Sequence, residues 1–286
     1  MHQIKYQIKT LSPILLSTNS GDMNTVATND YIPGHAILGV FASKYIQDEN
    51  LSNKAHQNTN FYHWFLNSGI IFSNAYPCKK DEYVTRVFFP IPLSIQTEKD
   101  NETLAIDLLQ KDSEKQMKMI SGYGYIAEAT IQRFTPSKSL NLHHARPDRI
   151  KGHSTEGRIF NYESIDPDQL FQGVIIGGED VLKDFIKSIL RDKKFSIQLG
   201  RSRTAQYGQA ELEVLSKSPE ELNLEEDLAS EFILTLLSPT IIYNKYGFSS
   251  TSQDTLKEYP ASKRVFSFFC YFAKNSLSYI YFTLIL

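Results

Sequence analysis

The pattern of apolar and polar positions predicts strands over most of the chain and helices in two places. Residues 3–16 alternate between the two classes and predict a strand that runs into a loop rich in Ser, Thr and Asn. Within residues 31–50, apolar residues recur at spacings of three and four, and Pro33 stands near the start, which predicts a helix. A second run of this kind predicts a helix over residues 179–190.

Shorter strands are predicted between and after the two helices. Their ranges are 70–75, 83–89, 124–134, 158–164, 170–176, 195–199 and 209–214. Residues 99–119 are polar and charged and therefore predict an exposed loop with some helix. This order of strands and helices occurs twice along the chain. It predicts an α+β fold with two ferredoxin-like units of the βαββαβ type. We place the first unit at residues 1–115 and the second at residues 116–216.

Residues 217–286 form an appended segment whose character changes along its length. It begins with six acidic side chains and no intervening Lys or Arg, which predicts either a solvated helix face or a face for a basic partner subunit. Residues 265–286 are strongly apolar, but polar residues at 274–276 interrupt them before the roughly 20 residues of a transmembrane helix are reached. We expect a buried helix or strand there and no membrane span. A truncated end of the chain is the alternative reading.

The composition is that of a soluble globular protein, with 41% hydrophobic and 22% charged residues. The 16 Tyr and 18 Phe residues favour a sheet-rich structure. The formal net charge is -2, so a nucleic-acid partner would require a local concentration of positive charge. The two cysteines, Cys78 and Cys270, are isolated in sequence, which excludes a disulfide framework and a Cys-rich zinc site and indicates the cytoplasm.

The stretch LGRSRTAQYGQAELEV, residues 199–214, carries the clearest candidate chemistry. Its two glycines permit positive φ and close approach to another chain, so the loop between them can present backbone N–H groups. Two arginines supply forked donors for phosphate, two hydroxyl residues supply further donors, and a tyrosine supplies a stacking face. We interpret the loop as a surface for single-stranded RNA, or alternatively as a merely soluble hairpin loop. Its residues are Gly200, Arg201, Ser202, Arg203, Thr204, Tyr207 and Gly208.

A second basic stretch covers residues 131–158. It holds six Lys or Arg residues against two acidic ones, a net charge of +4, and three histidines in addition. Because phosphate neutralisation dominates nucleic-acid affinity, this loop is the second candidate RNA contact. The alternative is an exposed hairpin connection. The candidate contacts are His143, His144, Arg146, Arg149, Lys151 and Arg158.

Several motifs together resemble the RAMP superfamily of CRISPR effector subunits, over roughly residues 1–215. The stretch 199–208 is similar to the family's glycine-rich loop, and YIPGHAILG at residues 31–39 is similar to its helix start. Residues 156–175 resemble its central hairpin, and residues 143–149 the basic loop ahead of that hairpin. The basic residue that usually precedes the helix glycine is absent before Gly39. The combination is most similar to the type III-D subunit that holds the handle end of the guide RNA.

The resemblance implies a non-catalytic, cytoplasmic subunit of a type III CRISPR ribonucleoprotein in antiviral defence. Such a subunit binds guide RNA and neighbouring subunits through ferredoxin-like folds and needs no cofactor or metal. The resemblance also makes the helix-start residues Pro33, Gly34 and His35 candidate site residues.

Two other functions remain open. Some RAMP proteins are metal-independent endoribonucleases that process CRISPR precursor RNA by general acid-base chemistry, and His35, His143 or His144 could serve in that role. A ferredoxin-like protein with no RNA partner is the second alternative.

Two further sequence patterns are interpreted as structural features and not as functional sites. The sequence Gly177-Gly178-Glu179-Asp180 resembles a metal-holding signature of nucleotide cyclases, but a helical run follows at once. We therefore expect Glu179 and Asp180 to be first-turn residues that oppose the helix dipole. Trp64 lies among three other aromatic residues and is expected in the core.

Overall fold

The computed structural model divides the chain into two compact units. Unit 1 comprises Met1–Val87 and Thr135–Glu220, and unit 2 comprises Phe88–Phe134 and Glu221–Leu286. The structure describes residues 1–18, 25–82, 84–109, 113–127, 129–144, 159–190, 192–203, 205–222, 234–237, 244, 246–250, 266–272 and 278–284.

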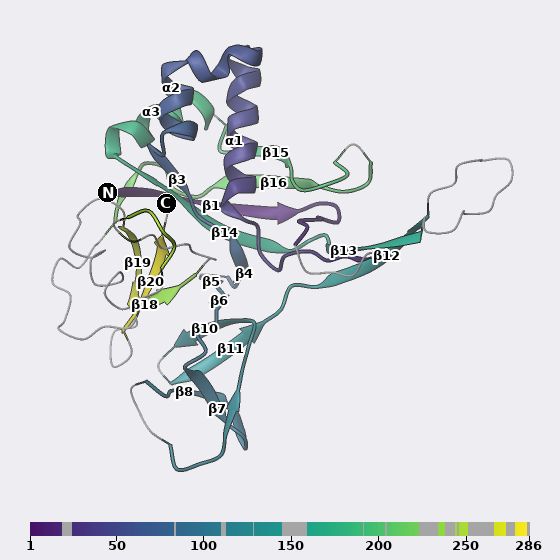
Figure 1. Ribbon diagram of the computed structural model, residues 1–286, viewed down its shortest axis with the longest axis vertical. Coiled ribbons are helices and arrows are strands. Elements are labelled where there is room, and N and C mark those ends of the chain that lie inside the picture. The colour runs from purple at the N-terminus through teal and green to yellow at the C-terminus, as the bar shows by residue number, and fades with distance from the viewer. Residues whose placement is uncertain are drawn as a thin grey trace, which may run out of the picture. The chain divides into compact units, whose positions relative to one another are not determined.

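Unit 1 is built on one antiparallel sheet (Figure 1). The strand order is β15-β16-β1-β14-β4-β5, and the short β3 and β17 pair with β14 and β1. Along the chain these elements are β1 (His2–Thr10), α1 (Gly34–Asp48), β3 (Ile70–Phe72), β4 (Tyr76–Lys80), β5 (Thr85–Val87), β14 (Leu170–Gly177), α3 (Glu179–Ile189), β15 (Lys194–Gln198), β16 (Gln209–Val214) and β17 (Glu220–Glu221).

Four of its strands, in the order β16-β1-β14-β4, follow the βαββαβ connectivity of one ferredoxin-like unit, with α1 after β1 and α3 after β14; the strands β3, β5, β15 and β17 are additional. The central pair joins β1 to β14, with Ile4 opposite Ile175 and Ile8 opposite Phe171. The predicted segments 1–115 and 116–216 therefore contribute strands to the same sheet. A second ferredoxin-like unit is not resolved in the described residues.

Both long helices cover the same face of the sheet, as Figure 1 shows. Ile37 and Phe41 of α1 and Phe185 of α3 are buried against β1 residues such as Ile4. Between α1 and β3 the chain forms η1 (Ser52–Gln57), α2 (Thr59–Phe61) and η2 (Tyr62–Leu66), which add aromatic rings to this core. Trp64 is 2% exposed and meets Phe185 edge-on at 5.5 Å between ring centroids, so its predicted core position is confirmed.

A separate three-stranded sheet in unit 1 has the order β12-β13-β2. The strands are β2 (Thr25–Val26), β12 (Lys138–His144) and β13 (Ile159–Ile165). Figure 1 draws β12 and β13 as a long ribbon, and we call this antiparallel pair the arm. The predicted basic loop is therefore partly wrong: residues 131–134 lie in β11, residues 138–144 form β12, which includes His143 and His144, and residues 145–158 lie outside the described residues.

Unit 2 contains strands where the sequence predicted a loop. Its larger sheet has the order β6-β10-β11-β8-β7-β9. The prediction of an exposed loop with some helix over residues 99–119 is wrong, because β7, β8 and β9 pair there. The predicted strand 124–134 is a hairpin of two strands. The bounds are β6 (Phe89–Pro90), β7 (Ile95–Glu98), β8 (Asn101–Asp107), β9 (Met117–Met119), β10 (Tyr123–Ala127) and β11 (Thr130–Phe134).

The apolar C-terminal segment also forms strands where it is described. These are β18 (Leu234–Leu236), β19 (Phe266–Phe272) and β20 (Ser278–Leu284), with β20 between the other two. Of the six acidic residues at the start of the segment, Glu220 and Glu221 lie in β17, and the other four lie outside the described residues. Within the described residues, no helix is both long and apolar enough to cross a membrane.

Candidate nucleic-acid interface

The glycine-rich loop, residues 199–208, joins β15 to β16 and is tied to the chain that follows β1. Gly200 and Gly208 have φ of 76° and 92°, as the sequence predicted. A Cβ atom at residue 200 would lie 2.2 Å from the carbonyl oxygen of Leu15. The backbone N–H of Arg201 donates to that oxygen at 2.9 Å, and the N–H of Gly208 donates to Pro13 at 2.8 Å. In this structure the close approach is therefore to the chain's own backbone, and these two N–H groups are already used.

The side chains of the loop fall into two groups. Arg201 and Arg203 are exposed, and neither guanidinium forms an ion pair with any part of the chain that the structure describes. Ser202 is partly exposed, and Thr204 lies outside the described residues. Tyr207 is 2% exposed, so its ring packs inside the protein and offers no open face to a base.

A cavity of about 360 Å³ lies between this loop and the start of α1. Helix α1 contributes His35 and Gly39, and the loop contributes Gly200, Arg201 and Arg203. The two motifs that the sequence singled out separately thus line one cavity. The remaining lining residues are Leu15, Leu16, Ser17, Asn29, Pro33, Ala36, Val40, Ser43, Gln198 and Leu199.

The electrostatics of this cavity favour an anion. The first turn of α1 contains no acidic residue and begins with Pro33 at the N-cap, so the positive end of its dipole has no local carboxylate against it. The Arg201 and Arg203 guanidinium groups add two full charges with donors that match phosphate oxygens. Ala36, Val40 and three leucines supply an apolar wall. Such a mixed lining fits a nucleotide, with its phosphate at the arginines.

The three helix-start residues have different surroundings. Pro33 is buried, and Gly34 is required for packing because a Cβ there would lie 2.2 Å from the carbonyl oxygen of Phe72. The N–H of Gly34 donates to Oδ1 of Asn74 at 2.8 Å. Pro33 and His35 both line the cavity, and His35 is the exposed member of this motif that offers a ligand a polar side chain.

The arm approaches the glycine-rich loop through His143. Its Nε2 lies 2.9 Å from the hydroxyl oxygen of Tyr207, and its ring stacks on Phe160 at 5.5 Å. His144 ends β12, and its side chain is not described. The predicted contacts Arg146, Arg149, Lys151 and Arg158 lie outside the described residues.

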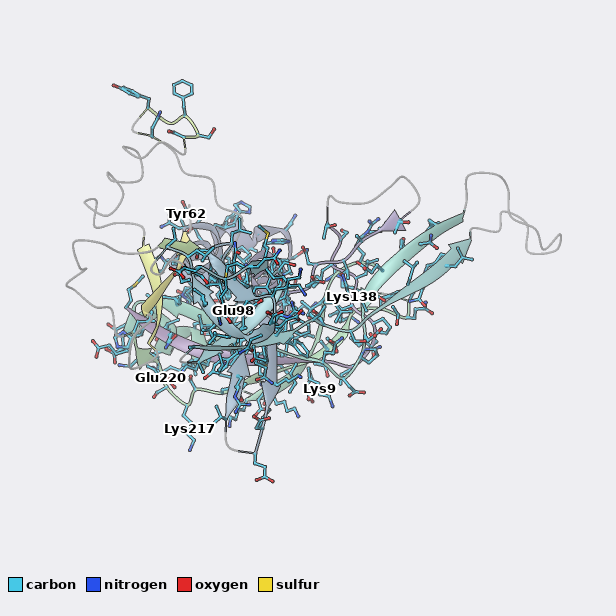
Figure 2. The ribbon with its side chains drawn as sticks, turned by 90° about the horizontal axis from the view of Figure 1, so that it is seen from below. Lys9, Tyr62, Glu98, Lys138, Lys217 and Glu220 are labelled. Carbon is cyan, nitrogen blue, oxygen red and sulfur yellow. The ribbon has the colours of Figure 1, made fainter. Side chains whose placement is uncertain are left out.

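Lys138, labelled in Figure 2, lies at the start of β12 and is held by two carboxylates. Its Nζ is 2.9 Å from Asp30 and 3.1 Å from Glu163. Burial by itself lowers the pKa of Lys138, but the hydrogen bonds to these two carboxylates raise it above its usual value. This lysine belongs to the basic stretch of the sequence, yet its charge is neutralised within the protein.

The acidic pair after β14 has the structural role predicted for it. Glu179 and Asp180 occupy the first turn of α3, and Glu179 pairs with Lys183 at 2.6 Å. This pairing lowers the pKa of the Glu179 carboxyl. No cluster of three potential metal ligands occurs among the described residues.

Sequence reasoning missed the polar residues that complete the cavity. Asn29 and Gln198 reach it from the segment before α1 and from the end of β15. Neither residue carries a motif. Gln198 directly precedes the glycine-rich loop, whereas only the folded chain places Asn29 on the same cavity as the arginines.

Comparison with known proteins gives a family and a set of distant structures. The chain matches the family profile described as the RAMP superfamily over residues 7–211. No curated protein matches the chain. A chain of the type III-B Cmr-beta complex bound to cognate target RNA is 13% identical, with a TM-score of 0.46 and coverage of 74% of this chain and 96% of that one.

Two other solved structures are similarly distant. Oligomeric Cmr4 from Pyrococcus furiosus is 13% identical, with a TM-score of 0.36 and coverage of 75% and 98% of the two chains. A chain of a type IV-B CRISPR complex is 12% identical, with a TM-score of 0.39 and coverage of 80% and 95%. The family profile spans most of the chain, including the glycine-rich loop and the start of α1. The chain therefore belongs to the RAMP superfamily.

Proposed function

We propose that this protein is a non-catalytic subunit of a cytoplasmic type III CRISPR ribonucleoprotein, of the III-D kind, that binds guide RNA and neighbouring subunits. Membership in the RAMP superfamily supports the class of function. The observation that carries the proposal is the cavity where the start of α1 faces Arg201 and Arg203. RNA phosphate would lie against the two guanidinium groups, and a nucleotide would occupy the cavity beside them.

The arm extends this proposed RNA site. The basic loop with Arg146, Arg149, Lys151 and Arg158 connects β12 to β13, and His143 links β12 to the glycine-rich loop. The two candidate RNA-binding loops therefore belong to neighbouring elements of unit 1. A strand of RNA that follows both loops would meet positive charge along its backbone.

The test is RNA retention without metal. Purified protein is incubated with labelled repeat-containing RNA, and bound RNA is resolved on a native gel and products on a denaturing gel. We expect retention without cleavage. The double variant Arg201→Ala, Arg203→Ala should bind more weakly and should flatten the salt dependence, by about 0.7 in the log-log slope for each phosphate that is no longer neutralised.

The matched control is Lys187→Ala, which removes an exposed cation on α3 away from the cavity lining. It should leave both the affinity and the salt slope unchanged. An equal weakening of RNA binding in the control and in the arginine variant would mean that the arginines act only through net charge. No retention by the unaltered protein would contradict the proposal.

The ribonuclease alternative is kept because His35 lines the same cavity as the two arginines. A general acid-base role needs a histidine within reach of the 2′-hydroxyl or of the leaving oxygen. A discrete product that disappears in His35→Ala, or in the His143→Ala, His144→Ala double variant, would establish this alternative in place of the non-catalytic role.

A further inference from the structure

His143 and Tyr207 connect two elements that are far apart in the sequence. His143 lies in β12 of the arm, and Tyr207 lies in the glycine-rich loop, 64 residues further on. Their polar atoms, Nε2 and Oη, share a hydrogen bond of 2.9 Å. The tyrosine hydroxyl donates this bond when the imidazole carries its proton on Nδ1. The buried ring of Tyr207 thus has its hydroxyl satisfied by the arm.

Strand register explains how the arm presents this histidine. Phe160 lies directly opposite His143, and Tyr162 lies opposite Asn141 on the neighbouring strand. Since side chains alternate between the two faces of a strand, these rings share one face with His143. The ring centroid of His143 is 5.5 Å from that of Phe160 and 4.7 Å from that of Tyr162. The imidazole is therefore held by ring packing, and its Nε2 is left facing Tyr207.

The loop needs such support because its backbone includes an uncommon conformation. Ser202 has φ of 55°, which a residue with a side chain adopts only at a cost unless its surroundings hold it. The backbone directly after Tyr207 packs against the stem of Arg203, since a Cβ at residue 208 would be 3.1 Å from Cγ of Arg203. A shift of Tyr207 would therefore disturb the position of the Arg203 guanidinium.

We infer that His143 is a positioning residue for RNA binding: through its hydrogen bond to Tyr207 it holds the glycine-rich loop so that Arg201 and Arg203 face the cavity. This inference rests on the proposed function. It gives His143 a structural role in place of acid-base chemistry, with Nε2 bonded to Tyr207. It also makes the arm and the glycine-rich loop one binding element.

The test removes the hydrogen bond from either side while keeping the rings. Tyr207→Phe and His143→Phe should each weaken RNA binding about 3- to 10-fold, the range expected for one hydrogen bond. Combining the two changes should cost no more than either alone, because they remove the same bond. His143→Gln should restore part of the affinity, since its side-chain amide carries a nitrogen that can reach the tyrosine oxygen.

Two further readouts separate positioning from mere stability. Backbone amides of residues 201–208 should exchange hydrogen faster in Tyr207→Phe, in the absence of RNA. The salt slope of RNA binding should also fall by about 0.7 if one arginine no longer neutralises its phosphate. Tyr162→Phe is the matched control, because its hydroxyl has no hydrogen-bond partner among the described residues while its ring lies in the same cluster. This control should change neither the amide exchange rate of the loop nor the salt slope of RNA binding.

The outcomes distinguish this inference from the proposed function. If the double arginine variant no longer binds RNA while Tyr207→Phe and His143→Phe bind like the unaltered protein, the proposed function stands and the positioning role is overturned. Additive effects in the His143, Tyr207 double variant would also overturn it, as would a lower unfolding midpoint with unchanged loop exchange. If neither the unaltered protein nor any variant binds RNA, the proposed function fails. Amide hydrogen exchange in the loop then still decides whether His143 positions the loop.

Discussion

Gly200 and Gly39 line the same cavity, but only position 200 requires a glycine. Gly200 adopts a positive φ and has its backbone against the carbonyl oxygen of Leu15. Gly39 lies in α1, and a Cβ there would meet nothing within 4 Å. The first position therefore requires glycine for both backbone conformation and space, and the second requires it for neither.

Alanine at these two positions should have effects of opposite sign on stability. We expect Gly200→Ala to lower the free energy of unfolding by about 1–3 kcal/mol, because of backbone strain and the clash with Leu15. Gly39→Ala should raise it by about 0.5–1 kcal/mol, because glycine is unfavourable within a helix. Denaturant unfolding followed by circular dichroism measures both values. A Gly200→Ala protein as stable as the unaltered one would show that the loop can move away from Leu15 without cost.

At the scale of elements, the arm is fastened to the segment before α1 by Lys138. Its ammonium group bridges Asp30 and Glu163, and the other oxygen of Glu163 accepts a hydrogen bond from the backbone N–H of Thr28 at 3.0 Å. The lysine side chain is only 24% exposed, so water screens these pairs less than it screens those on the open surface.

Replacing Lys138 should reveal a contribution to the free energy of unfolding that depends on pH. We expect Lys138→Met to lower the free energy of unfolding by about 1 kcal/mol near neutral pH. Because the pKa of Lys138 is raised in the folded protein, its contribution is fully present below the usual lysine value of 10.5 and is lost as pH rises through the higher folded value. The difference between the two proteins should therefore shrink as the solution becomes strongly alkaline.

The control for this prediction is Lys183→Met, which breaks one exposed pair within α3. Its effect should be smaller than that of Lys138→Met, because water screens an exposed pair within one helix. A Lys138→Met effect no larger than that of the control would show that the bridge does not fasten the arm.

At the scale of the whole molecule, residues 88–134 form an insertion in the sequence of unit 1. The strands before and after them, including β1, β4, β14 and β16, pair without using any of these residues. The inserted residues have their own sheet and their own ring pair, in which the rings of buried Phe88 and half-buried Phe134 lie 5.2 Å apart.

Unit 1 should consequently fold without this insertion. We expect replacement of residues 88–134 by a flexible Gly/Ser linker of about 20 residues, which spans roughly 25 Å, to preserve cooperative unfolding and RNA retention. Replacing residues 52–66 with the same linker is the control and should abolish cooperative unfolding, because Trp64 and Phe65 belong to the core. Loss of the thermal transition in the first variant would show that unit 1 depends on the insertion.

The sequence by itself determined the elements whose signal is local. Helical spacing predicted α1 and α3, whose bounds in the structure are Gly34–Asp48 and Glu179–Ile189. Runs of β-branched and aromatic residues predicted β13 to β16, and the two glycines predicted positive φ in the loop between β15 and β16. These signals can be read from neighbouring residues because backbone conformation and amphipathic spacing are local properties.

Only the tertiary structure decided which elements meet. The pairing of β1 with β14 placed strands of both predicted units in one sheet, and no local pattern specifies a partner so far along the chain. The polar sequence of residues 95–119 did not predict its strands, which are recognised only by their pairing. The reason is that β-propensity depends on cross-strand neighbours. The sequence suggested a stacking face for Tyr207, but in the folded chain its ring is buried and its hydroxyl is bonded to Nε2 of His143. The cavity that joins His35 to Arg201 and Arg203 exists for the same reason, because distant segments become neighbours only when the core between them is buried.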